Sequence, residues 1–137
     1  MASAAEARVS GHERWAVESR IVEKPWGWEL IWAHTDTYVG KVLFVRAGQS
    51  LSLQYHEQKD ESWYVQSGLA RLELGEVGDT ELTTDSIAAG ACFRFAPGTV
   101  HRVTAVEDTT IIEVSTPHLD DVVRIEDAYG RAGTAEP

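Results

Sequence analysis

Cysteine is nearly absent from this sequence, because Cys92 is the only one among 137 residues. A single cysteine excludes an intramolecular disulfide and any cysteine-rich zinc site. Basic residues are scarce as well: 12 Lys and Arg stand against 22 Asp and Glu, which gives a formal net charge of −10. Phosphodiester backbones and anionic lipids repel such a chain, so we expect it to bind neither nucleic acid nor a membrane surface.

Long apolar runs are missing too. No stretch approaches the roughly 18 apolar residues of a membrane-spanning helix, and the N-terminal part has no continuous apolar segment of the signal-peptide type. A hydrophobic fraction of 43% is nevertheless enough to build a core in a chain of this length. We therefore predict a single domain located in the cytoplasm.

The sequence also lacks a convincing helical stripe of apolar residues. Short runs of strand-forming residues recur instead at intervals of about ten residues, with glycines or Pro97-Gly98 in the gaps. This pattern predicts an all-β sandwich or barrel of the jelly-roll kind over residues 21–131. Residues 1–20 are predicted to form a flexible or partly helical arm, and residues 132–137 a disordered tail. The predicted strands are Trp28–Trp32, Val39–Arg46, Leu51–Tyr55, Ser62–Gln66, Leu69–Leu74, Glu81–Thr83, Ala91–Phe95, His101–Val106, Thr110–Val114 and Asp121–Ile125.

Four side chains carry donors of the metal-binding type: Gln54, His56, Glu61 and His101. The run from Leu51 to His56 alternates apolar and polar residues, so Gln54 and His56 share one face of a predicted strand. Glu61 begins the next strand and His101 begins a later one, and both can point into the same cavity. One amide oxygen, two imidazoles and one carboxylate suit Zn²⁺ first, with Fe²⁺, Mn²⁺, Ni²⁺ and Co²⁺ as alternatives.

The spacing of these residues resembles two sequence motifs of the cupin superfamily. The first motif, G-x5-H-x-H-x(3,4)-E-x6-G, is matched at Gly48, His56, Glu61 and Gly68. Gln54 occupies its first histidine slot. Residues 90–101 resemble the second motif, G-x5-P-x-G-x2-H-x3-N, although the proline stands one position late, at 97, and Ala105 replaces the asparagine. The resemblance implies a single-domain cupin jelly roll, which is a double-stranded β-helix.

Among cupins, residues 22–131 resemble the cupin domain of type II mannose-6-phosphate isomerases. Glutamine at the first ligand slot, followed by Glu61 and Trp63, is typical of that family, and KPWGWE at residues 24–29 resembles its opening segment. IEV at residues 112–114 and DVVRIEDAYGR at residues 121–131 match its closing segments. The 137 residues contain no counterpart of the nucleotidyltransferase domain that often precedes this cupin domain, so guanylyl transfer is not expected of them.

The resemblance implies aldose–ketose isomerisation of a sugar phosphate through a cis-enediol, with one divalent metal ion as cofactor. The implied metal ligands are Gln54, His56, Glu61 and His101. The predicted catalytic residues are Lys41, Glu113 and Arg124, and the predicted substrate-binding residues are Arg124, Trp63 and Lys41. Two of these have structural alternatives, because Lys41 could be a solvated edge lysine and Trp63 a core residue.

One part of the family pattern is altered here. Where the family reads H-H-H-R-x-E-H-W, Glu57, Gln58 and Lys59 replace two histidines and an arginine at the rim of the site. This altered rim favours one alternative function, a non-catalytic, metal-stabilised sugar-binding cupin. A second alternative is an iron-dependent cupin dioxygenase or related oxygenase, against which Gln54 argues, because such proteins more often carry three histidines. We expect a homodimer that pairs through sheet edges.

Overall fold

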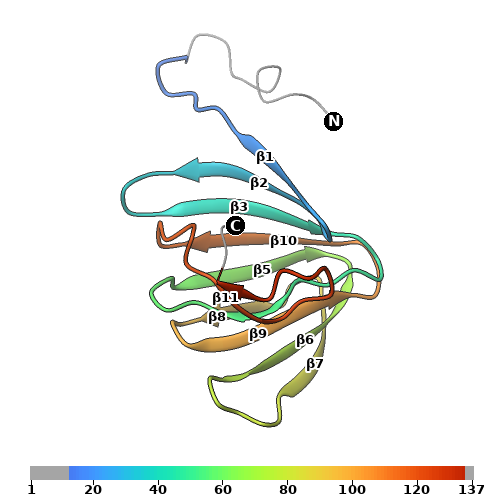
Figure 1. Ribbon diagram of the computed structural model, residues 1–137. Helices are drawn as coiled ribbons and strands as arrows, with labels where there is room; N and C mark the ends of the chain where they lie inside the picture. The colour runs from blue at the N-terminus through green and yellow to red at the C-terminus, as the bar shows by residue number, and fades with distance from the viewer. Residues whose placement is uncertain (1–12, 135–137) are drawn as a thin grey trace.

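The computed structural model describes residues 13–134, in which twelve strands form two six-stranded antiparallel sheets (Figure 1). The strands are β1 (Arg20–Lys24), β2 (Gly27–His34), β3 (Val39–Val45), β4 (Leu53–Tyr55), β5 (Glu61–Ser67), β6 (Leu69–Glu76), β7 (Thr83–Ala88), β8 (Cys92–Phe95), β9 (Thr99–Ala105), β10 (Thr109–Ser115), β11 (Val123–Glu126) and β12 (Gly133–Thr134). Across residues 13–134 we find no helix with the length and apolar character needed to cross a membrane.

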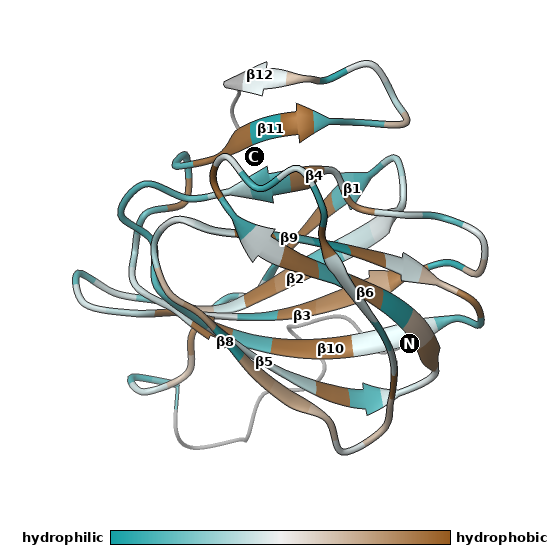
Figure 2. Ribbon diagram, turned by 90° about the horizontal axis from the view of Figure 1, so that it is seen from below, coloured by the Kyte–Doolittle hydropathy of each residue, from teal (hydrophilic) through white to brown (hydrophobic). Residues whose placement is uncertain are grey.

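The two sheets face each other as the layers of a jelly roll. One sheet has the strand order β1-β2-β3-β10-β5-β8 and the other has the order β12-β11-β4-β9-β6-β7. Neighbouring strands are often distant in sequence: β3 pairs with β10, and β4 pairs with β9 and β11. Figure 2 shows hydrophobic and hydrophilic segments alternating along strands of both layers. The predicted all-β jelly roll is therefore confirmed.

All ten predicted strands overlap observed ones, although the bounds differ. The poorest match is Glu81–Thr83, which shares only Thr83 with β7, because β7 is a polar edge strand in which Ile87 alone is buried. Two strands, β1 and β12, were not predicted. β12 places Gly133 and Thr134 in a strand, although they belong to the predicted tail. Residues 1–12 of the predicted arm and 135–137 of the tail lie outside the described residues.

Apolar side chains fill one end of the space between the sheets. We call this end the apolar half of the interior. Leu43 pairs with Ile111, and Ile111 pairs with Val65, so a continuous apolar row crosses three strands. Each of these side chains is almost completely buried, which contributes about 1.5–3 kcal/mol per side chain. The members of the apolar half are Leu43, Val45, Val65, Ala70, Leu72, Ile87, Val103, Ala105 and Ile111.

Candidate metal centre and its cavity

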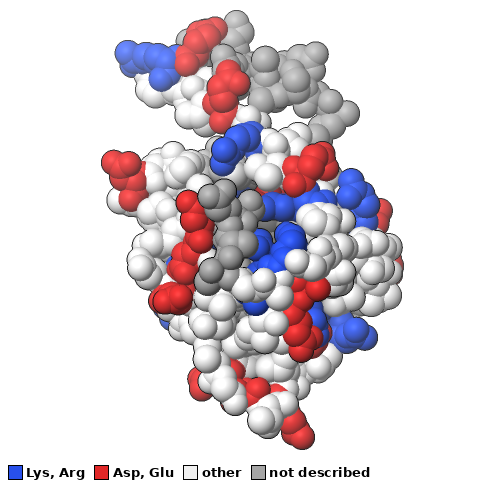
Figure 3. Space-filling view, in the orientation of Figure 1, with Lys and Arg blue, Asp and Glu red and all other residues white. Residues whose placement is uncertain are grey.

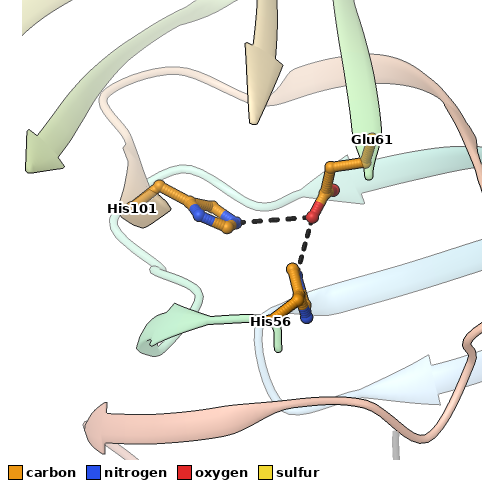
Figure 4. Close-up of side chains that lie close together, drawn as sticks. All are labelled: His56, Glu61 and His101. Carbon is orange, nitrogen blue, oxygen red and sulfur yellow. Dashed lines mark ion pairs between the residues drawn. The ribbon is translucent and has the colours of Figure 1, made fainter. Parts of the chain in front are cut away.

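Three buried ligand-type side chains converge at the other end of the same interior. His56 follows β4, Glu61 begins β5 and His101 lies in β9, and Figure 4 shows the three pointing toward one another. Glu61 Oε2 is 2.6 Å from His56 Nε2 and 3.7 Å from His101 Nε2. One ligand atom of each residue lies within 4.8 Å of the other two. The structure thus brings together three of the four predicted ligands as a candidate metal centre.

The donor atoms of this cluster fit a metal ion. His56 Nε2, Glu61 Oε2 and His101 Nε2 are buried, and none makes a hydrogen bond of normal geometry within the described residues. The other ring nitrogens are engaged, because His56 Nδ1 contacts the Asp121 carbonyl oxygen and His101 Nδ1 lies 3.0 Å from the Thr99 carbonyl oxygen. A carbonyl at Nδ1 favours the tautomer in which Nε2 carries the lone pair, as metal-binding histidines require.

The electrostatics of the cluster agree with this chemistry. Burial lowers the pKa of His101 to about 4, although the Glu61 carboxylate opposes the shift, so the imidazole is neutral near pH 7. Burial alone would raise the pKa of Glu61, but Lys59 and His56 outweigh it and hold that pKa well below its usual value. Neutral imidazole and ionised carboxylate are the protonation states that bind a divalent metal.

Gln54 faces the same cavity, as strand alternation predicts. It pairs with His101 across β4 and β9, and with Arg124 across β4 and β11. Paired residues in antiparallel strands project from the same face, so the three side chains form a row from the metal centre toward β11. The Gln54 amide oxygen accepts a hydrogen bond of 3.0 Å from Ser52 Oγ. The predicted strand register is thereby confirmed, whereas ligation by Gln54 stays a prediction.

Lys41 lies inside the cavity wall and not at a solvated edge. It is 5% exposed, and its ammonium is 2.7 Å from Glu29 Oε2, while Lys24 binds the other oxygen of Glu29 at 3.2 Å. Burial opposes ionisation of Glu29, but the two lysines hold its pKa below the ordinary value. Lys41 was predicted from the sequence, whereas Lys24 and Glu29, both in the KPWGWE segment, were not.

Glu113 lies next to Lys41 in the register of β3 and β10, and is held from two sides. The Trp63 indole N–H donates to Glu61 at 2.8 Å and to Glu113 at 3.1 Å, and the Lys59 ammonium is 3.1 Å from Glu113 Oε2. Burial raises the pKa of Glu113 in spite of Lys59. Trp63 is 2% exposed, so it is a buried residue that also lines the cavity.

Lys59 was predicted to lie at the rim of the site, and this prediction is wrong. The structure buries it between Glu113 and Glu61, whose carboxylates raise its pKa although burial would lower it. Its neighbours Glu57 and Gln58 are exposed, as expected of rim residues. The sequence contains a signal for this position. Lys59, Glu61 and Trp63 are two residues apart, which is the spacing of residues on one face of a strand.

Two further contacts assemble the site from distant segments. The Gly98 N–H donates to the His56 carbonyl at 2.8 Å, and Gly98 has a φ of 87°, in the left-handed region that favours glycine. This turn joins the segment of the second motif to that of the first. On the other side, the Asp121 carboxylate accepts hydrogen bonds from the backbone N–H groups of residues 57, 58 and 59. Asp121, like Lys24, Glu29 and Lys59, was not predicted from the sequence to be part of the site.

The cavity as a whole is rich in cations, although the chain is acidic. Five basic side chains line it, Lys24, Lys41, Lys59, Arg124 and Arg131, against three carboxylates, Glu29, Glu61 and Glu113. Figure 3 shows Lys and Arg side chains gathered near the middle of one face with acidic side chains around them. We call these eight residues together with Gln54, His56 and His101 the polar half of the interior. Such a local excess of positive charge attracts an anionic ligand.

Comparisons with known proteins agree with the sequence and the fold. The family profile described as "Mannose-6-phosphate isomerase C-terminal" matches residues 11–127. Mannose-1-phosphate guanylyltransferase ManC of Salmonella typhimurium is 38% identical over 120 residues, which make up 82% of this chain and 23% of that protein. Xanthan biosynthesis protein XanB of Xanthomonas campestris is 34% identical over 123 residues, 82% of this chain and 24% of that protein. The chain thus spans about a quarter of the length of these curated relatives.

Solved structures share the fold at lower identity. The capsular polysaccharide assembling protein CapF from Staphylococcus aureus superposes with a TM-score of 0.62 at 17% identity, covering 85% of this chain and 33% of that one. At this identity the likeness shows the fold alone, and the fold is that of a cupin. The predicted cupin architecture is therefore confirmed.

Proposed function

The chain belongs to the family of mannose-6-phosphate isomerase C-terminal domains, and from that membership we propose that it is a metal-dependent aldose–ketose isomerase of a sugar phosphate. The observation that carries the proposal is a buried His–Glu–His cluster, of which His56 and Glu61 line the same cavity as five basic side chains. An isomerase of this class needs both features, because negative charge develops on the sugar oxygens during reaction and the substrate carries an anionic phosphate.

His56, Glu61 and His101 would hold the metal ion, and Gln54, next to His101 in the sheet, would complete the ligand set. A divalent ion bound there supplies Lewis-acid stabilisation for the charge that develops on the sugar oxygens. Two imidazoles and a carboxylate favour Zn²⁺, and the same donors accept Fe²⁺, Mn²⁺, Ni²⁺ or Co²⁺.

Glu113 is the side chain best placed to move the proton between C1 and C2 of the sugar. Its carboxyl group is buried in the cavity wall, where the Trp63 N–H and the Lys59 ammonium fix its position. These partners donate hydrogen bonds and accept none, so the carboxyl group of Glu113 remains the acceptor within reach of a substrate proton. Lys41, already bound to Glu29, serves substrate binding in this scheme.

Arg124 would bind the phosphate. It lies on β11 and faces Gln54, which itself faces His101, so its backbone is two strand spacings, roughly 10 Å, from that of His101. A guanidinium presents a planar fork that matches two phosphate oxygens. A sugar phosphate bound this way has its reacting carbons at the metal end and its phosphate at the β11 end of the cavity.

The experiment that tests the proposal compares wild type with Arg124→Lys in the conversion of mannose 6-phosphate to fructose 6-phosphate. Lysine keeps the charge and removes the fork, so kcat/KM should fall about ten- to a hundredfold, or roughly 1.5–3 kcal/mol, at unchanged metal content. Arg102→Lys is the matched control, because Arg102 pairs with Glu73 and does not line the cavity. Its kcat/KM should equal that of wild type.

Different negative results of this experiment point to different conclusions. A metal-loaded wild type that isomerises no hexose or pentose phosphate refutes the isomerase. Tight sugar-phosphate binding without turnover would then favour the sugar-binding cupin, and oxygen uptake by an iron-loaded protein would favour the oxygenase.

We also propose that the protein is a homodimer located in the cytoplasm. Light scattering on the purified protein measures its mass and tests the dimer.

A further inference from the structure

Asp121 makes an unusual set of contacts between two distant segments. Its carboxylate accepts three consecutive backbone N–H groups: Glu57 at 3.0 Å, Gln58 at 2.6 Å and Lys59 at 2.8 Å. Its carbonyl oxygen contacts Nδ1 of His56. Successive N–H groups that point at one carboxylate form an anion-binding nest, a geometry that orders both partners. Asp121 therefore fixes the loop that carries one ligand of the metal centre and also touches that ligand.

Asp121 belongs to a segment that covers the cavity. We call residues 119–122, which precede β11, the strap. Leu119 and Val122 of the strap and Arg124 of β11 line the cavity, and Val122 and Arg124 are 8% and 6% exposed. Figure 1 shows β11, which the strap enters, crossing in front of the strands of the barrel. With the strap in this position the cavity volume is about 70 Å³.

That volume is far below the roughly 300–1,000 Å³ of pockets that enclose small molecules. A sugar phosphate therefore needs either a displacement of part of the lining or the adjoining cavity of about 210 Å³, which shares Glu29, Lys41 and Leu119. Most of the lining belongs to paired strands of the two sheets, whereas residues 119–122 precede β11 and lie outside any strand. The strap can therefore move without breaking a strand pair, and Asp121 holds it closed.

We propose that Asp121 is a positioning residue that couples closure of the strap to metal binding at His56. The inference rests on the metal site of the proposed function and adds its regulation. When the strap is closed, the Asp121 carbonyl fixes the His56 ring with Nε2 toward Glu61. Coupling of this kind is reciprocal, so a bound metal ion must also favour the closed strap.

The test compares Asp121→Ala with Asp120→Ala, a matched control in which the neighbouring, exposed carboxylate is removed. Zn²⁺ affinity is measured by competition with a chelator, and amide hydrogen exchange of residues 119–122 is followed with and without Zn²⁺. Asp121→Ala keeps the backbone carbonyl at His56 Nδ1 but removes the carboxylate that holds this carbonyl in place. Zn²⁺ affinity should therefore fall, by no more than the roughly 10- to 100-fold that loss of an outer partner of a metal ligand costs. Asp120→Ala should match wild type, and Asp121→Asn, which retains one acceptor oxygen, should be intermediate.

In wild type, Zn²⁺ should slow exchange in the strap, and in Asp121→Ala the strap should exchange fast in both conditions. Equal Zn²⁺ affinity of the two alanine variants would overturn the coupling. If Asp121→Ala does not fold, as judged by circular dichroism, Asp121→Asn carries the same comparison. If wild type binds no Zn²⁺, the proposed metal site fails. Amide hydrogen exchange of the strap in the metal-free proteins then shows whether Asp121 holds the strap closed. Equal exchange rates in wild type and Asp121→Ala would refute this role of Asp121 as well.

Discussion

The two halves of the interior are equally buried and opposite in chemistry. On β3, Lys41 is 5% exposed and Leu43 is 3% exposed; on β9, His101 is 1% exposed and Val103 is 0% exposed. The members of each pair are two residues apart, so they project from the same face of the same strand. Along each strand the inward side chain changes from charged or ionisable to apolar within one step.

The apolar side chains stabilise the fold, whereas the buried ionisable side chains cost folding free energy. Apolar burial in the one half stabilises the jelly roll by roughly 25 cal/mol for each Å² removed from water. Burial of ionisable groups in the other half costs free energy, which ion pairs such as Glu29–Lys41 only partly offset. Replacing buried ion pairs by apolar residues is often neutral or stabilising in proteins, so the retention of the polar half indicates a function.

The largest expected effect is the loss of metal from the polar half. Substituting both His56 and His101 by Ala removes two of the three clustered donors, and the purified protein should lose its single stoichiometric metal ion. The measurement is elemental analysis after dialysis. His34→Ala is the control, because His34 is exposed on β2, and it should keep full metal content. Full occupancy in the double variant would place the metal elsewhere.

In the apolar half the expected effect is on stability alone. Leu72 is 0% exposed and lies opposite Val103, so Leu72→Ala leaves a cavity that should cost about 2–5 kcal/mol of unfolding free energy. The measurement is urea denaturation of the metal-free protein, with Val106→Ala as an exposed control that should change by less than about 0.5 kcal/mol.

The metal content of folded Leu72→Ala should equal that of wild type. A variant that keeps its stability but loses its metal would show that the two halves are not separable.

Local pattern predicted most of this arrangement. The spacing of glycines and strand residues indicated the jelly roll, and alternation along β4 placed Gln54 on the inner face, where β9 presents His101. The missed features depend on contacts between distant residues. Asp121 meets residues 57–59 across more than sixty positions of sequence, which no local period records. β1 was missed because it is a largely exposed edge strand with little hydrophobic alternation.

A smaller effect distinguishes the halves by pH. The two lysines hold the pKa of Glu29 below its ordinary value of 4.5, so Glu29 stabilises the fold above that pH. This stability is lost as the pH falls through the lowered pKa, because the unfolded chain then binds the proton first. Unfolding free energies of metal-free protein, measured from pH 7 down to about 3.5, should therefore decline less steeply below pH 4.5 in Glu29→Gln than in wild type.

Leu72→Ala, by contrast, should lower the stability at every pH and keep the wild-type slope. Parallel curves for Glu29→Gln and wild type would show that Glu29 carries no linked proton.

The smallest effect concerns Gln54, the predicted ligand that is not part of the His–Glu–His cluster. Gln54→His replaces an amide oxygen by an imidazole, a better donor for first-row metals, on a strand position that already faces the cavity. If Gln54 is a ligand, the affinity of the variant for Zn²⁺ should equal that of wild type or exceed it by up to a few-fold. Its kcat should differ from that of wild type, because the imidazole changes the charge distribution at the metal. Chelator competition and the isomerase assay measure the two quantities.

Gln54→Leu is the matched control, because leucine keeps the approximate volume of the side chain and removes the donor atom. This variant should weaken Zn²⁺ binding. Identical affinities for wild type, Gln54→His and Gln54→Leu would show that the metal is held by His56, Glu61 and His101 without Gln54.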